Sequence, residues 1–257
     1  MNRSIDLNCD MGEGFESDAA IIPYVTSVNI ACGYHAGDAA TMRKTIRLAV
    51  DHGVAIGAHP GLADRANFGR LAMPVTPQEV YDLVLYQAGA LAAFARAVGA
   101  AVTHLKPHGA LYNMAAKDAA IAQAIAAATR DFDSACILVG LAGSELIKAG
   151  ENAGLTTARE AFADRTYQAD GSLTSRDSAD AIIHDPAAAA ERVLKMVLQS
   201  TVTSQQGTEV PLRPDTICIH GDSLGAADMA KTIRERLQRE GIVVKSMAGI
   251  AGGGAKP

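Results

Sequence analysis

The sequence contains no tryptophan, few aromatic residues and only four cysteines. Aromatic residues make up 4% of the chain and its lysines and arginines form no basic stripe, which argues against a nucleic-acid-binding surface. No two cysteines form a C-x-x-C pair, so zinc-ribbon and thioredoxin-like sites are excluded; the four are Cys9, Cys32, Cys136 and Cys218. We expect all four to be reduced and buried, as in a cytoplasmic protein.

Targeting signals and several common ligand-binding motifs are also missing. The longest apolar run, 119–128, is shorter than the roughly 18–20 residues that a membrane span requires, and residues 1–10 lack the apolar core of a signal peptide. No P-loop pattern occurs. Gly12-Glu13-Gly14 begins like a dinucleotide fingerprint, but Ser17 replaces its third glycine. We therefore expect neither a nucleic-acid nor a membrane partner.

Short apolar segments alternate with helical patterns through the whole chain, which indicates a (β/α) barrel or a doubly wound sheet. One helix start is strongly marked, because Thr76, Pro77 and Glu79 form a capping box with proline at the first helical position. We expect a single domain over 1–257 with a flexible tail from about 249. The expected strands are 4–11, 28–32, 54–58, 102–105, 136–139, 157–162, 216–219 and a short eighth at 242–245. The expected helices are 18–25, 39–52, 77–98, 118–129, 144–152, 186–198 and 222–240.

The first strand has one unusually polar face. Because side chains alternate across a strand, Asp6, Asn8 and Asp10 share one side and the apolar residues share the other. A strand buried on both faces normally reads as continuously apolar. The polar face therefore predicts a polar pocket in the interior of a barrel.

Four segments share another arrangement, in which a short apolar run is followed by a histidine and then by a glycine one or two residues later. The histidines are His35, His59, His108 and His220. In (β/α) barrels the active site lies at the carboxyl ends of the strands, where Asp10, Glu13 and Lys106 would also fall. Acids, imidazoles and one lysine in this position favour an enzyme site for general acid–base chemistry or metal binding.

Taken together, these segments resemble the lactam-utilisation LamB/YcsF family, which comprises the A subunits of 5-oxoprolinases. The matching stretches are Asp6–Gly14, Ser27–Asp38, Gly57–Gly61, Phe68–Arg70, Lys106–Asn113, Glu160–Arg165 and His220–Asp222. The resemblance implies a seven-stranded (β/α) barrel of the glycoside hydrolase/deacetylase type. It also implies an ATP-dependent amidohydrolase that cleaves a cyclic amide, 5-oxo-L-proline, to L-glutamate, with ATP as cofactor and with partner subunits B and C.

Roles for individual residues follow as hypotheses. Activating an unstrained lactam needs a cation for phosphate or an oxyanion, a base for water and an acid for the departing nitrogen. The catalytic candidates are Asp10, Lys106, His108 and His220. The substrate-binding candidates are Asn8, Glu13, Asn29, Arg70 and Arg165, of which the arginines would hold the substrate carboxylate. By analogy with deacetylase-type barrels, a divalent cation would be held by Asp10, His35 and His59.

Structural roles compete with these hypotheses. Asp6 and Asn8 would hydrogen-bond neighbouring strands in the lumen, and Lys106 would form an ion pair with Glu160 or Asp222. Two other functions also remain open: a stand-alone metal-dependent deacetylase-like hydrolase, and a non-catalytic binding subunit of a lactamase complex.

Overall fold

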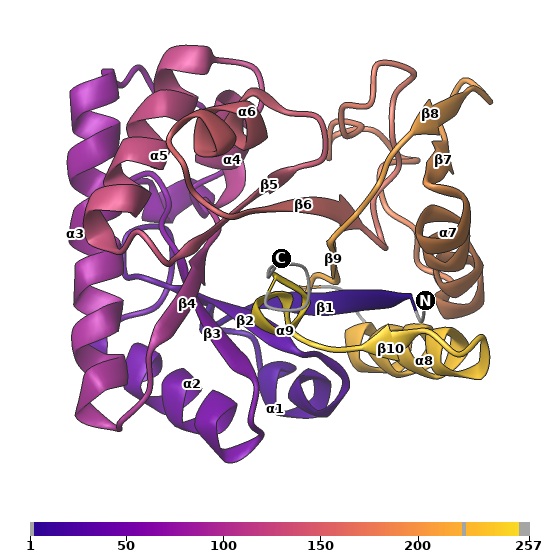
Figure 1. The fold of residues 1–257 in the computed structure, drawn as a ribbon, viewed down its shortest axis with the longest axis horizontal. Helices are drawn as coiled ribbons and strands as arrows, with labels where there is room; N and C mark the ends of the chain where they lie inside the picture. Colours follow the sequence, from indigo (N-terminus) through magenta and orange to yellow (C-terminus); the bar gives the residue numbers. More distant parts are fainter. Residues whose placement is uncertain (1–2, 223–224, 252–257) are drawn as a thin grey trace, which may run out of the picture.

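Seven parallel strands form a closed barrel at the centre of the computed structural model, which describes residues 3–222 and 225–251 (Figure 1). The barrel closes where β9 pairs with β1, in the register Asn8 opposite Cys218. The strands are β1 (Ser4–Met11), β2 (Ser27–Ala31), β3 (Ala55–His59), β4 (Val102–Leu105), β5 (Ile137–Leu141), β6 (Thr157–Phe162) and β9 (Thr216–Cys218). The prediction of a seven-stranded (β/α) barrel is confirmed.

Helices surround the strands on the outside of the barrel (Figure 1). The predicted capping box at Thr76 and Glu79 is present at the start of α3, and Asp185 caps α7. No helix in the described part of the chain has the length and apolarity needed to cross a membrane. The helices are α1 (Asp18–Ile21), α2 (Ala39–Asp51), α3 (Pro77–Ala97), α4 (Gly109–Ala115), α5 (Ala119–Phe132), α6 (Glu145–Asn152), α7 (Pro186–Gln199), α8 (Ala226–Arg239) and α9 (Met247–Ala251), with 3₁₀ turns η1 (Ile22–Tyr24) and η2 (Arg65–Asn67).

Three segments differ from the sequence-based expectations. The stretch after α7 contains an antiparallel hairpin of β7 (Thr201–Thr203) and β8 (Glu209–Pro211), where no strand was expected. The unpredicted helix α4 begins directly after β4 and is too short to show a clear period. The eighth strand, β10 (Val243–Val244), pairs with the first residues of β1 and is not one of the strands that close the barrel.

The tail that was expected to be flexible lies partly inside and partly outside the described chain. Residues 249–251 belong to the helix α9. Residues 252–257 lie outside the described part of the chain.

The polar face of β1 points into the barrel, as its alternation predicts. Asp6 lies lowest and is hydrogen-bonded by the hydroxyls of Thr26, Ser27 and Thr216. Asn8 lies one level higher and donates to Glu160 over 3.0 Å. These contacts confirm the expectation that Asp6 and Asn8 hydrogen-bond across the lumen.

A glycine makes room for a histidine at the middle level. Gly57 on β3 faces His104 on β4, and a Cβ atom on Gly57 would lie 2.1 Å from His104 Nε2. His104 fills this space, and its Nε2 lies 3.0 Å from Asn29 Oδ1. The lumen is therefore closed below the level of Asp10.

Candidate active site

A buried lysine forms the floor of the site. Lys106 Nζ lies 2.9 Å from Asp10 Oδ1, 2.9 Å from Glu160 Oε1 and 3.2 Å from Cys218 Sγ. Burial alone would lower the pKa of Lys106, but the neighbouring Asp10, Cys218 and Glu160 raise it well above its ordinary value. For Asp10 the directions are reversed. Burial alone would raise the pKa of Asp10, but the positive charges of His59 and Lys106 lower it well below its ordinary value. At neutral pH the floor therefore holds an ammonium ion and an ionised Asp10.

Asn8 and Asn29 hold this floor from below. Both side chains are fully buried, and Asn29 donates to both Asn8 Oδ1 and Asp10 Oδ1 over 2.8 Å. Neither residue lines the cavity above the floor. They orient Asp10, and the expectation that they contact a substrate finds no support in this arrangement.

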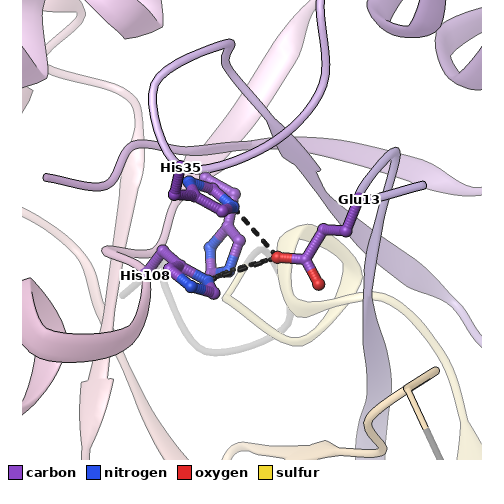
Figure 2. A group of neighbouring side chains, drawn as sticks. Glu13, His35 and His108 are labelled. Atoms are coloured by element: carbon purple, nitrogen blue, oxygen red, sulfur yellow. Dashed lines mark hydrogen bonds and ion pairs between the residues drawn. The ribbon is translucent and has the colours of Figure 1, made fainter. Parts of the chain in front are cut away.

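Next to Asp10, three histidines surround the carboxylate of Glu13. Its Oε1 lies 3.0 Å from His35 Nε2, 3.2 Å from His108 Nδ1 and 3.8 Å from His59 Nε2. Figure 2 shows this oxygen directed toward His35 and His108, whose rings stack with centroids 3.7 Å apart. His59 also approaches Asp10, with 3.4 Å between Nε2 and Oδ2. The strand ends of β1 and β3 and the loops that follow β1, β2 and β4 thus bring five predicted histidine and acid positions close together.

Backbone carbonyls fix the protons of two of these imidazoles. His59 Nδ1 lies 2.7 Å from the carbonyl oxygen of Lys106, and His108 Nε2 lies 2.8 Å from that of Phe68. A carbonyl only accepts, so both of these nitrogens carry hydrogen. The remaining nitrogens, His59 Nε2 and His108 Nδ1, face each other over 3.0 Å. In the neutral rings both would present lone pairs, so this contact calls for a hydrogen on one of the two nitrogens or for a metal ion between them.

This donor set fits a divalent cation. Glu13, His35, His59 and His108 each offer one ligand atom within 4.8 Å of the others, and nitrogen with oxygen ligands suits zinc and related transition metals. Asp10, predicted as a ligand, instead groups with Cys218 and His220. The carbonyl bonds on the far side of the His59 and His108 rings are the contacts that orient ligating histidines. His35, predicted as a ligand, belongs to the cluster, while His108 and Glu13 were predicted for other roles.

After β9, the strand that pairs with β1, His220 is held by a buried acid. Its Nδ1 lies 2.8 Å from Asp164 Oδ2, and its ring stacks on Phe162. Burial would raise the pKa of Asp164, but His220 lowers it below its ordinary value. An ionised Asp164 accepts the Nδ1 hydrogen and leaves Nε2 with its lone pair for the cavity. This is the arrangement of an oriented general base.

A cavity of about 950 Å³ lies above these groups. Its wall includes the long loop between β6 and α7 and the predicted residues Arg70 and Arg165. Asp10, Glu13, His59, Lys106, His108 and His220 also line it. The structure therefore brings eight of the eleven predicted site residues around one space, whereas Asn8, Asn29 and His35 do not line it.

Sequence reasoning assigned no role to two members of the site, Asp164 and Cys218, the second of which was expected only to be buried. The expected ion pair between Lys106 and Glu160 is present. The position of Asp164, an acid two residues after the strand end at Phe162, could have marked it as a site residue. The contact of Cys218 with Lys106 depends on barrel closure, which no local pattern reveals.

Comparisons with known proteins agree with this architecture. The LamB/YcsF family model matches residues 5–252. The A subunit of 5-oxoprolinase from Geobacillus thermodenitrificans is 58% identical over 95% of this chain and 97% of its own length. That of Bordetella pertussis is 55% identical over 96% of this chain and 100% of its own length.

Solved structures lead to the same family. The lactam utilization protein from Thermus thermophilus superposes with a TM-score of 0.89 at 44% identity, over 94% of this chain and 99% of that one. A T48 deacetylase, at 15% identity and a TM-score of 0.52 over 100% of this chain and 94% of that one, shares the fold alone. The family match and the high identity over almost the full length establish that this chain belongs to the LamB/YcsF family.

Proposed function

We propose that this chain is the A component of a 5-oxoprolinase and opens the lactam ring of 5-oxo-L-proline to give L-glutamate. The observation that carries the proposal is the joint presence of relatives of that name at 54–58% identity and of a buried acid–base site in the matched fold. ATP hydrolysis to ADP and phosphate supplies the driving force, with further subunits of the complex contributing to that step. Subunits B and C are the expected partners.

Ring opening requires proton transfer, charge stabilisation and substrate binding, and different residues of this chain perform each. His220, oriented by Asp164, takes a proton from the attacking water and returns it to the ring nitrogen as the C–N bond breaks. Lys106 stabilises the negative charge that develops on the carbonyl oxygen. Asp10 holds Lys106 in place, and Arg70 and Arg165 are the candidates for the substrate carboxylate.

A divalent cation, if bound, would be held by Glu13, His35, His59 and His108. It would supply Lewis-acid polarisation of the carbonyl and lower the pKa of water nearby. The proposed proton transfers through His220 do not depend on it.

An omission experiment tests the proposal. Glutamate is measured after 5-oxoproline and ATP are mixed with this chain, with subunits B and C, or with all three. We expect glutamate only from the complete mixture and only with ATP. Equal glutamate formation without this chain would contradict the proposal, and lactam hydrolysis by this chain alone would favour the stand-alone hydrolase.

A further inference from the structure

The ring of Phe162 lies against three residues of the cavity wall. Phe162 is the last residue of β6, is only 2% exposed, and itself lines the cavity. The ring of His220 stacks on it, with centroids 5.4 Å apart and planes inclined by 12°. Lys106 Nζ lies 5.5 Å from its centroid, and Tyr112 packs edge-on at 5.9 Å. One apolar side chain is therefore the common neighbour of His220, which transfers protons in the proposed reaction, and of Lys106, which stabilises charge.

Strand pairing explains why Phe162 meets His220. β6 and β9 are parallel neighbours, and Phe162 lies opposite Cys218, two residues before His220. The backbone N–H of Phe162 donates to the hydroxyl of Tyr167 over 2.9 Å. Tyr167 is fully buried and does not line the cavity. The end of β6 is therefore anchored from behind, and the ring of Phe162 is presented to the cavity from a fixed backbone.

Two residues of this strand end hold one imidazole. Asp164 accepts the hydrogen of His220 Nδ1, while Phe162 lies against the face of the same ring. The hydrogen bond fixes the tautomer, but one bond at one nitrogen leaves the ring plane free to pivot. Aromatic rings prefer offset-stacked geometry at such centroid distances, so the Phe162 ring removes this freedom.

The same ring attracts the ammonium group of Lys106. A cation within about 6 Å of an aromatic centroid is drawn to the negative face of the ring. The other close partners of Lys106 Nζ are Asp10, Glu160 and Cys218, which form the floor of the site. Phe162 is therefore the contact that relates the position of the ammonium group to that of the imidazole.

We propose that Phe162 is a positioning residue for ring opening, whose ring sets the plane of His220 and the separation between His220 and Lys106. This inference rests on the proposed function. In that reaction both groups act on a single amide, because His220 serves the water and the nitrogen while Lys106 serves the carbonyl oxygen. Their spacing must match that one small group, and a displacement of about 1 Å can lower a rate by about 100-fold.

A residue that only fills space would behave differently. Another apolar side chain of similar volume could replace it with little effect on the rate. Methionine nearly matches the volume of phenylalanine but is flexible and has no planar face. Phe162→Met therefore separates positioning from packing, and it also decides the question if Phe162→Leu, which removes more volume, does not fold.

The first test is proton and nitrogen NMR of the isolated full chain, which requires no substrate. The Nδ1 proton of His220 is held by the buried Asp164, so it should exchange slowly with water and give a downfield resonance that is absent in His220→Asn. We expect this resonance to broaden or disappear in Phe162→Leu and Phe162→Met, because the imidazole pivots away from Asp164. Phe132→Leu, at a partly buried position on α5, is the matched control and should retain it. An unaltered resonance in both Phe162 variants would overturn the proposal.

The second test measures kcat and KM for 5-oxoproline with the assembled complex. Phe162→Leu and Phe162→Met should each lower kcat by about 10- to 100-fold and leave KM within about twofold of the wild-type value, while Phe132→Leu should match the wild type. Wild-type kcat in both Phe162 variants would overturn the proposal. So would a raised KM with unchanged kcat, since Phe162 would then bind substrate instead of positioning His220.

Failure of the proposed function gives a different result. A wild-type complex that forms no glutamate would refute that function, whatever residue is changed. The NMR measurement does not depend on turnover, so it would still decide whether Phe162 sets the orientation of His220.

Discussion

Asp164 Oδ2 lies 2.8 Å from Nδ1 of His220 and fixes which nitrogen of that ring carries hydrogen. Asp164 is buried and His220 is partly open to the cavity, so the acid sits behind the imidazole with respect to the cavity. This order of cavity, imidazole and carboxylate makes His220 the proton-transfer group and Asp164 its positioning residue.

Replacing Asp164 by asparagine tests this relationship. The amide keeps the shape of the carboxylate but loses its charge and can donate to Nδ1, which reverses the tautomer of His220. We expect glutamate formation by the complex to fall by roughly 10²–10⁴, with a smaller change in the KM for 5-oxoproline. Asp51→Asn, at the exposed end of α2, is the control. A kcat within twofold of wild type would remove Asp164 from the mechanism.

Lys106 should be essential to the stability of the barrel as well as to activity. Lys106→Met leaves Asp10 and Glu160 buried without their shared counter-charge, which should cost about 3–5 kcal/mol in the free energy of unfolding. Glu160→Gln in the same chain should restore part of this loss. Urea unfolding followed by circular dichroism measures both, with Lys148→Met at an exposed ion pair as the control. A single variant as stable as wild type would contradict the ion-pair account.

Acid sensitivity should arise partly from His104. Burial lowers the pKa of His104 from 6.5 to about 3, so its neutral form stabilises the fold above pH 6.5 and this contribution is lost as the pH falls toward 3. Between pH 6 and 4.5, His104→Asn should reduce the slope of unfolding free energy against pH by about 1.4 kcal/mol per pH unit. The measurement is urea unfolding at several pH values, with His52→Asn on the surface as the control. An identical slope in the His104 variant would show that this histidine is not held neutral.

The histidine–glutamate cluster should retain a metal ion. After incubation with Zn²⁺ and gel filtration, we expect about one equivalent per chain by elemental analysis. His59→Gln and His108→Gln should each lose most of it, because each removes one converging nitrogen, while His184→Gln on the surface should not. Retention of no zinc by the wild type, or equal retention by all variants, would show that this cluster does not hold the metal.

Much of this architecture could be predicted from local sequence patterns. The alternation of Asp6, Asn8 and Asp10 predicted their common direction, and the positions after the apolar runs placed His35 and His59 at the strand ends. Both inferences rest on the period of a strand, which is a local property. The capping box of α3 was predictable for the same reason.

Other features depend on the closed barrel and have no local signal. Cys218 contacts Lys106 only because β9 returns to β1, and Gly57 matters because His104 on the next strand fills its space. Asp164 precedes a long loop without periodicity, so its contact with His220 depends on the three-dimensional fold and has no local sequence signal. The proton positions of His59 and His108 follow from carbonyl oxygens supplied by distant residues.

The most direct test of the central claim is glutamate formation by the complex assembled with a His220→Asn chain. His220 lines the cavity and its loss leaves the Lys106 ion pairs untouched, so the variant should fold and assemble. If the lactam ring is opened in this cavity, the glutamate rate should fall by roughly 10²–10⁴ while the complex stays intact by gel filtration. An intact complex that forms glutamate at the wild-type rate would show that the ring is opened elsewhere.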